Sequence, residues 1–511
     1  MKNPTEIWNG IQERCKKEWK LAFFSTFLMG ILIHMPVMLR DIPNHDGLAS
    51  MYFDQNMITS GRWFLTVACG ISSYYTLPWL IGLLSMLYLG IASALLTEYL
   101  EVRQGWAILL IGGLLAVFPS LASTFAYVFT MDGYMLAVLL SILAVLLTKK
   151  YRWGFLPGAL CLACSLGTYQ SYLPFAVLLS LYGVYMTAAS EGTVGEKIKK
   201  VLRYVWMGGI GVAAYYVILR ILLLIQGKEL ASYQGISGMG SAPQAGIGGT
   251  VLHMYRDFAA FTLKGNVFMN NFFSWGAMIL LGVGCAAVLL RLCLQKKWWK
   301  SIWFFAIIAV TAAGLPLAMN LILVISPDVT YHLLMRYHWV LLPICMVAAV
   351  SRHSEKIPWA SWLGLACGLV LLFNYGVTDQ IAYSNLQKKY EKTYAYCVRL
   401  LDRIEQTPGY YQGIPIAMIG VVGDRSYPAT DITQDVTAGM IGIGGDSLLY
   451  TGANYQAFIR HYLGATLNIL PPEAMEDMYY NQAYREMDSF PAPDSIRIID
   501  GVLYVKTENK E

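Results

Sequence analysis

The chain has 511 residues, of which 56% are hydrophobic and only 14% are charged, and its mean hydropathy is +0.49. Soluble domains contain about 25% charged residues, so this composition excludes an entirely soluble protein. The formal net charge of +5 does not indicate a nucleic-acid-binding protein, and we expect no nucleic acid among its partners.

About eleven apolar segments approach the length that crosses the roughly 30 Å hydrocarbon core of a bilayer. The first follows a basic start and is not followed by a small-residue cleavage pattern, so we expect a retained signal-anchor. The fifth and sixth are short and adjacent, which leaves the count open by one pair. The predicted spans are 21–39, 76–98, 105–126, 131–148, 153–167, 170–188, 204–225, 272–291, 301–325, 335–350 and 358–377.

The distribution of Lys and Arg between alternate loops predicts the orientation. If the N-terminus is cytoplasmic, the inner loops collect most of the basic residues and the outer loops hold few. The inner-loop residues are Arg103, Lys149, Lys150, Arg152, Lys197, Lys199, Lys200, Arg203, Arg291, Lys296, Lys297, Lys300, Arg352 and Lys356. We therefore expect a multi-pass protein of the cell membrane with a cytoplasmic N-terminus and an extracytoplasmic C-terminal domain.

Two outer loops are long enough to form structure of their own. Residues 40–75 contain an amphipathic stretch from Leu48 to Phe64, and we expect it to lie as a helix on the membrane surface. Residues 227–271 open with a glycine-rich stretch, Gly235 to Gly249, and close with a second amphipathic stretch, Val251 to Leu263. We expect this second stretch to be interfacial as well.

The sequence after the last predicted span has the composition of an ordinary globular domain. It begins with a helical run, Ile381 to Glu405, continues with short strands, and contains an Asp500-Gly501 pair that is typical of a tight hairpin. We therefore predict a polytopic α-helical membrane domain over residues 1–377. A small soluble α/β domain is predicted over residues 378–511.

Ionisable residues near or inside the bilayer are costly, so they are candidates for function. The run Asn44-His45-Asp46-Gly47 follows the first span and places a carboxylate where it could act as a general base. The alternative is a polar turn that caps the next helix. Asp132 begins a later span, and there it is either an N-cap or a second carboxylate of the same outward cavity.

Basic and aromatic residues gather on the same predicted outer side. Arginine binds phosphate through paired hydrogen bonds, so these cations indicate a phosphorylated lipid head group. Snorkelling to the interface and, for Arg220, a structural ion pair are the alternatives. Aromatic and amide groups that could bind a sugar are also explained by an ordinary aromatic belt. The candidate phosphate-binding residues are Arg62, Arg220, Arg336 and His338. The candidate sugar- or acceptor-binding residues are His45, Asn44, Tyr169, Gln170 and Tyr172.

We predict no metal ion and no other cofactor. Cys161 and Cys164 have the spacing of a metal or redox pair, but they lie within a predicted span and lack a second pair. This favours a packing role for both cysteines. Asp46 and Asp132 alone are too few ligands for a divalent cation.

The order and spacing of four short motifs resemble the glucosyltransferase GtrII family, within the wider GT-C superfamily of membrane glycosyltransferases. The motifs are Asn44-His45-Asp46, Gly61-Arg62-Trp63, Met131-Asp132-Gly133-Tyr134 and Gly167-Thr168-Tyr169-Gln170-Ser171-Tyr172. The resemblance covers the membrane portion, residues 10–380. The C-terminal domain matches nothing in the family and is treated as particular to this branch.

The resemblance implies transfer of a sugar, usually glucose, from a polyprenyl-phosphate-linked donor to a cell-surface glycan such as O-antigen or teichoic acid. It also implies inversion at the anomeric carbon, with Asp46 as general base and Asp132 as a second acidic residue. The donor phosphate would then be held by Arg62, which lies in a matched motif, with Arg220 and Arg336 as further candidates. A transporter or flippase of lipid-linked sugars and an outer-leaflet glycan polymerase or ligase remain as alternatives.

Overall fold

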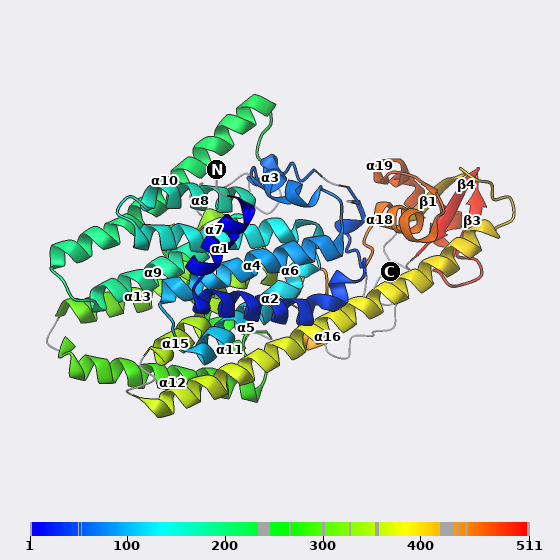
Figure 1. Cartoon of the computed structure of the whole chain (residues 1–511). Coiled ribbons are helices and arrows are strands. Elements are labelled where there is room, and N and C mark those ends of the chain that lie inside the picture. Colours follow the sequence, from blue (N-terminus) through cyan, green and yellow to red (C-terminus); the bar gives the residue numbers. More distant parts are fainter. Residues whose placement is uncertain are drawn as a thin grey trace.

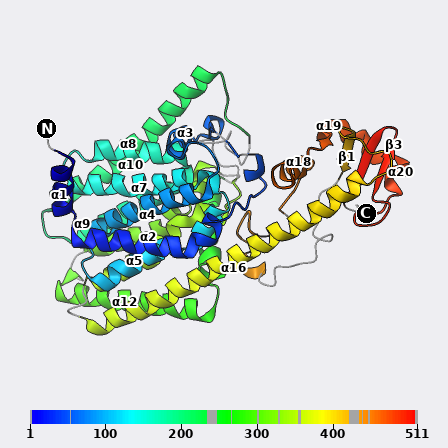
Figure 2. The same cartoon turned by 45° about the vertical axis from the view of Figure 1, so that its right-hand side comes forward.

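The computed structural model consists of a bundle of long helices and a small domain built on a four-stranded sheet (Figure 1). It describes residues 3–49, 51–52, 54–232, 246–264, 267–298, 302–326, 329–352, 357–419, 434–437, 439–444 and 448–507. Helix α1 (Pro4–Arg14) lies at one end of the bundle, and the small domain projects from the opposite end (Figure 2).

Eight helices in the described part of the chain are long and apolar enough to cross a membrane, some of them together with a preceding 3-10 turn. They identify a multi-pass membrane protein. These helices and turns are α2 (Lys17–Met38), α4 (Pro78–Leu100), η4 (Val128–Thr130) with α7 (Met131–Lys150), η5 (Gln170–Tyr172) with α9 (Leu173–Ala189), α10 (Val194–Gln226), α12 (Phe272–Gln295), η8 (Leu333–Val340) with α15 (Leu341–Ser351), and α16 (Pro358–Glu405).

Three of the predicted spans coincide with shorter apolar helices, so the prediction of about eleven spans is confirmed only in part. These helices are α5 (Gly105–Val117), α8 (Phe155–Thr168) and α13 (Ile302–Met319). Helix α5 is apolar on all sides and is buried along nearly its whole length, because α2, α4, α15 and α16 pack around it. It therefore belongs to the centre of the bundle.

Helix α16 runs without interruption for 48 residues from the bundle into the small domain (Figure 1). At 1.5 Å per residue its length is about 72 Å. The predicted span at 358–377 and the predicted helical run from Ile381 to Glu405 are therefore one helix, and the predicted domain boundary falls within it. Asp379 and Lys389, near its middle, are both buried.

The small domain contains a mixed sheet with strand order β2-β1-β4-β3. Strand β1 (Pro415–Ile419) pairs in parallel with β2 (Asn468–Ile469) and with β4 (Val502–Lys506), whereas β3 (Ile496–Ile499) pairs antiparallel with β4. The predicted hairpin is confirmed, because Asp500 and Gly501 join β3 to β4 with positive φ angles of 50° and 80°. The helical segments of this domain are α17 (Gln434–Thr437), α18 (Gly452–Phe458), η9 (Ile459–Leu463), α19 (Pro472–Met475), η10 (Asp477–Tyr480) and α20 (Gln482–Arg485).

In the described residues of the 40–75 loop, the stretch from Leu48 to Phe64 does not form the predicted interfacial helix. Gln55 and Gly61 adopt positive φ angles of 57° and 74°, which interrupt any regular helix, and Leu48 is buried. The loop instead contains η1 (Gly47–Ala49), η2 (Ile58–Ser60), α3 (Leu65–Cys69) and η3 (Gly70–Ser72).

The second predicted interfacial stretch, Val251 to Leu263, lies within one helix, α11 (Gly246–Lys264). This helix packs against α13 and α14 (Ile322–Ile325). Most of the predicted glycine-rich stretch lies outside the described residues.

Candidate active site

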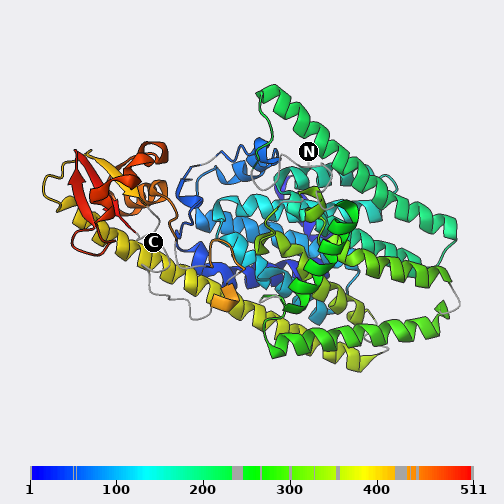
Figure 3. The same ribbon diagram turned by 180° about the vertical axis from the view of Figure 1, so that it is seen from behind.

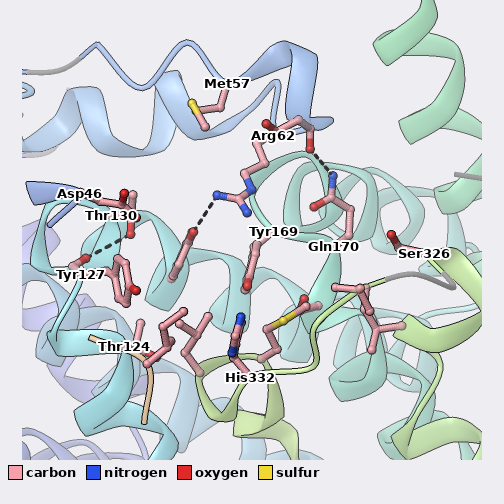
Figure 4. Close-up of a pocket in the computed structure, with 18 of the residues that line it drawn as sticks. Asp46, Met57, Arg62, Thr124, Tyr127, Thr130, Tyr169, Gln170, Ser326 and His332 are labelled. Carbon is pink, nitrogen blue, oxygen red and sulfur yellow. Dashed lines mark hydrogen bonds between the residues drawn. The ribbon is translucent and has the colours of Figure 1, made fainter. Parts of the chain in front are cut away.

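A cavity of about 530 Å³ lies among the 40–75 loop, the turns η4 and η5, and the segment from α14 to η8 (Figure 4). This volume lies within the usual range of small-ligand sites. Five of the residues predicted from sequence line it: His45, Asp46, Arg62, Tyr169 and Gln170. Tyr134 lines it as well, so the structure brings together residues from all four motifs.

The side chain of Asn44 shapes the turn that presents the next two residues. Its Nδ2 donates a 2.6 Å hydrogen bond to the carbonyl of Ala126, and its Oδ1 accepts a 2.7 Å bond from the backbone N–H of Gly47. Asn44 is buried and does not line the cavity. For this residue the polar-turn interpretation describes what the structure shows.

His45 and Asp46 stand together at the cavity. The Nε2 atom of His45 lies 3.6 Å from Oδ1 of Asp46, and the Asp46 side chain is 59% exposed. Burial lowers the pKa of His45 below its usual 6.5, the carboxylate of Asp46 opposes this shift, and the charge of Lys389 adds to it. At neutral pH the imidazole is therefore uncharged, beside an accessible carboxylate.

The lowered pKa of His45 has a measurable consequence for stability. As pH falls below 6.5, His45 is protonated in the unfolded chain while it stays neutral in the folded chain. The unfolded state is stabilised by this proton, so the contribution of His45 to the free energy of unfolding decreases as pH falls. We expect the difference in Tm between wild type and His45→Gln to be larger at about pH 7.5 than at about pH 5. A Tm difference that is the same at both pH values would contradict this assignment.

A tight turn presents Arg62 to the cavity. The backbone N–H of Arg62 donates to the carbonyl of Met57, and Gly61 between them adopts a φ of 74°. The Arg62 Nη1 donates a 3.2 Å bond to the Tyr134 hydroxyl, and its guanidinium carbon lies 4.8 Å from the centre of the Tyr169 ring. The rings of Tyr134 and Tyr169 stack with centroids 4.5 Å apart. In the described part of the chain, Arg62 is the only lining residue with a permanent positive charge.

The second and fourth motifs contact each other directly, which holds the Arg62 turn in place. Gln170 Nε2 donates 3.0 Å bonds to the carbonyl of Ser60 and to the hydroxyl of Tyr215 (Figure 4 shows the first). The ring of Trp63 packs on Gly167, where an added Cβ would lie only 2.5 Å from the indole. Gly167 is therefore required for this close approach.

Several lining residues were not singled out from the sequence. Gln55, Tyr127 and Tyr134 add polar and aromatic groups, and His332 lies on the side opposite Arg62 (Figure 4). Ile441, from the C-terminal domain, also lines the cavity. Among the lining residues that were not singled out, Tyr134 and Ser171 belong to recognised motifs, so the sequence offered a signal for these two.

Asp132 and Tyr172 belong to the motifs but do not line the cavity. Asp132 is buried in the first turn of α7, and its Oδ1 accepts a 2.8 Å bond from the backbone N–H of Gly133. Tyr172 is buried between Tyr169 and Phe175. The structure therefore does not show two carboxylates in one cavity.

Arg336 and His338 are also buried and do not line the cavity. The two terminal nitrogens of Arg336 donate 2.7 Å bonds to the two carboxylate oxygens of Asp257 on α11, and its guanidinium stacks on Tyr331. His338 Nε2 lies 2.8 Å from the carbonyl of Met319. Arg336 therefore forms a structural ion pair, which was the alternative considered for Arg220.

Arg220 lies on α10, whose C-terminal end extends away from the other helices (Figure 3). Its side chain is exposed, and its Nε donates a 2.8 Å bond to the hydroxyl of Tyr216 one turn earlier. The structure does not bring Arg220 to the cavity.

The Arg336–Asp257 pair allows a direct test of a structural role. Arg336→Ala leaves a largely buried carboxylate unpaired, which costs about 3–5 kcal/mol, so we expect a strong loss of Tm. Replacing both partners, as Arg336→Met with Asp257→Leu, should restore much of that loss. A normally stable Arg336→Ala protein with weakened binding of a phosphate-containing donor would instead support a role in the site.

The fold and the cavity define a class of protein: a multi-pass membrane protein with a polar, aromatic pocket that is lined in part by its C-terminal region. A model of the family described as glucosyl transferase GtrII matches residues 35–347, more than half of the chain. The chain belongs to this family, and membership implies a membrane glucosyltransferase with a sugar donor and an acceptor. A search of curated proteins found no significant match, and a search of solved structures found none either.

Proposed function

We propose that this enzyme transfers glucose, with inversion, from a polyprenyl-phosphate-linked donor to a glycan on the outer face of the cell membrane. The observation that supports it most is that Asp46 and Arg62, from different turns of the 40–75 loop, line the same cavity (Figure 4). A carboxylate can remove the proton of an acceptor hydroxyl, and a guanidinium can bind the donor phosphate. The C-terminal domain would face outward with the cavity.

In the proposed step, the acceptor hydroxyl gives its proton to a carboxylate oxygen of Asp46 as its oxygen attacks the anomeric carbon. The bond from that carbon to the phosphate oxygen breaks, and its electron pair stays on the departing polyprenyl phosphate. Arg62 stabilises the negative charge that develops on this leaving group. The exposure of Asp46 lets a bulky glycan reach the base from outside.

The cavity has two chemically different sides. Tyr134, Tyr169 and Gln170 line the cavity with phenol rings and an amide group, to which sugar hydroxyls can bond, whereas Ile322 and Ile325 line it from α14 with apolar side chains. An apolar side next to a polar one suits a donor that joins a sugar phosphate to an isoprenoid chain.

The proposal is tested by transfer of label from synthetic polyprenyl-phosphate-glucose. The purified protein, in lipid nanodiscs, would be mixed with radiolabelled donor and isolated cell-surface glycan, and the configuration of the new linkage read by NMR. We expect one glucose per acceptor site, with inverted configuration. Label that crosses the bilayer of proteoliposomes without new linkages would favour the flippase. Long polymers would favour the polymerase or ligase.

A further inference from the structure

The loop that contains Asp46 lies between the helical bundle and the C-terminal domain. On the bundle side, Asn44 bonds to the carbonyl of Ala126. On the other side, the side chain of Leu48 is buried in the hydrophobic core of the C-terminal domain, with Leu400, Tyr455 and Phe458. Both ends of this short turn are therefore fixed, but by different parts of the molecule.

Asn454 connects the start of α18 to the residue before Asp46. Its Oδ1 accepts bonds from the backbone N–H groups of Tyr450 and Thr451, at 3.1 and 3.2 Å, which caps the helix. Its Nδ2 donates a 3.2 Å bond to the carbonyl of His45. One amide group thus performs two separable tasks, and only the second involves the Asp46 loop.

Two more contacts reach the same loop from the C-terminal domain. The hydroxyl of Tyr462 donates a 2.8 Å bond to Oδ2 of Asp41, near the end of α2. The ring of Tyr450 lies edge-on to the imidazole of His45, with centroids 4.8 Å apart. The domain therefore contacts this loop at residues 41, 45 and 48.

The segment 439–444 brings the same domain to the cavity itself. Gly442 adopts a φ of 81° and packs on Tyr127, so a side chain there would be strained and crowded. The Nζ of Lys389 donates a 2.9 Å bond to the carbonyl of Gly444, which ties this segment to α16. Ile441, directly before Gly442 in this segment, lines the cavity.

From these contacts we infer that the C-terminal domain is part of the active site, with Asn454 and Tyr462 as positioning residues for the Asp46 loop. The inference rests on the proposed role of Asp46 as general base. The family match ends at residue 347, so these positioning contacts come from outside the matched region. A misplacement of about 1 Å can cost about a hundredfold in rate, so small displacements of this loop matter.

The sharpest test is Asn454→Asp, because a carboxylate keeps the cap of α18 but cannot donate to the carbonyl of His45. Its matched control is Asn468→Asp, which removes a similar bond to the carbonyl of Gly413 within the C-terminal domain. We expect kcat for glucose transfer to fall about 10- to 100-fold in Asn454→Asp and in Tyr462→Phe. The donor KM should stay unchanged, and the control should behave as wild type.

Asn454→Asp also adds a negative charge. The pH profile of kcat and the variant Tyr462→Phe, which adds no charge, separate the effect of that charge from the effect of the lost hydrogen bond. A positioning effect lowers kcat at every pH, whereas an effect of charge on Asp46 moves the profile along the pH axis. Unchanged kcat in both variants would overturn the inference. A fall in kcat that Asn468→Asp shares would overturn it as well.

A measurement without catalysis separates this inference from the proposed function. Hydrogen exchange reports the amides of Gly47 and Leu48, which donate to the side chain and the carbonyl of Asn44. We expect faster exchange in Asn454→Asp and not in Asn468→Asp. Unchanged protection would overturn the coupling itself. If exchange is faster in Asn454→Asp but the wild-type protein transfers no sugar, the coupling between the domain and the loop is upheld. The proposed function, and with it the role of Asn454 in positioning a base, is then overturned.

Discussion

Asp46→Asn is expected to lower kcat for glucose transfer by about 10²- to 10⁴-fold, the usual contribution of a general base, while donor binding stays nearly unchanged. Asparagine has the size of aspartate but cannot accept the acceptor proton. The exposed Asp46 side chain lines the cavity, so the substitution should not disturb the packing of the fold. Rates from radiolabelled donor and a separate donor-binding isotherm measure the two effects.

Asp132→Asn is the comparison for this experiment. Asp132 is buried in the first turn of α7 and does not line the cavity. We therefore expect Asp132→Asn to change Tm while kcat per folded molecule stays close to that of wild type. Full activity in Asp46→Asn, together with a loss in a well-folded Asp132→Asn protein, would contradict the assignment of the base. It would instead make Asp132 the residue to examine.

Arg62→Ala is expected to weaken donor binding by about 10- to 100-fold, because a hydrogen bond to a charged group contributes about 1.5–3 kcal/mol. The rate should fall too, since the charge on the leaving phosphate grows in the transition state. Arg62→Lys should recover only part of the affinity, because an ammonium group lacks the planar stacking on Tyr169. Titration with polyprenyl-phosphate-glucose, with unlinked glucose as competitor, measures the phosphate contribution.

Arg220→Ala serves as the matched control for Arg62→Ala. Both remove a guanidinium that bonds to a tyrosine hydroxyl, but Arg220 is exposed on α10 and lies outside the cavity lining. We expect the Arg220 variant to bind donor as wild type does. Equal losses in both variants would show that the effect comes from general surface charge and not from this cavity.

The positions of the membrane helices could be predicted because apolar composition alone specifies them. The continuity of α16 could not be predicted from hydropathy. Its apolar run ends near residue 377, but polar residues such as Asp379 and Lys389 continue the same helix while buried in the structure. Hydropathy locates the end of an apolar run. It does not locate the end of a helix, because polar residues can continue the same helical backbone.

The candidate site was predictable where a motif residue faces the cavity, as Asp46, Arg62 and Tyr169 do. Motif membership did not separate these residues from Asn44, which is buried and shapes the turn behind them. Arg336 does not line the cavity and is paired with Asp257, which the sequence did not indicate. Its partner Asp257 lies far away in sequence, and charge alone does not reveal whether a cation is already paired.

The contribution of the C-terminal domain was the least predictable part. Ile441 and Asn454 lie far from Asp46 in sequence and in no recognised motif, and they reach it only because α16 continues out of the bundle. Such contacts depend on the placement of a whole domain, and a local pattern of residues contains no information about that placement.

In the proposed mechanism, this cavity holds the donor with its phosphate at Arg62 and its sugar beside Asp46. The most direct measurement is a cryo-EM structure of the Asp46→Asn protein in nanodiscs with polyprenyl-phosphate-glucose. We predict density for the phosphate on the guanidinium of Arg62 and for the glucose between Tyr169 and residue 46. Donor density in the middle of the bundle, with this cavity empty, would contradict the account and favour a transporter.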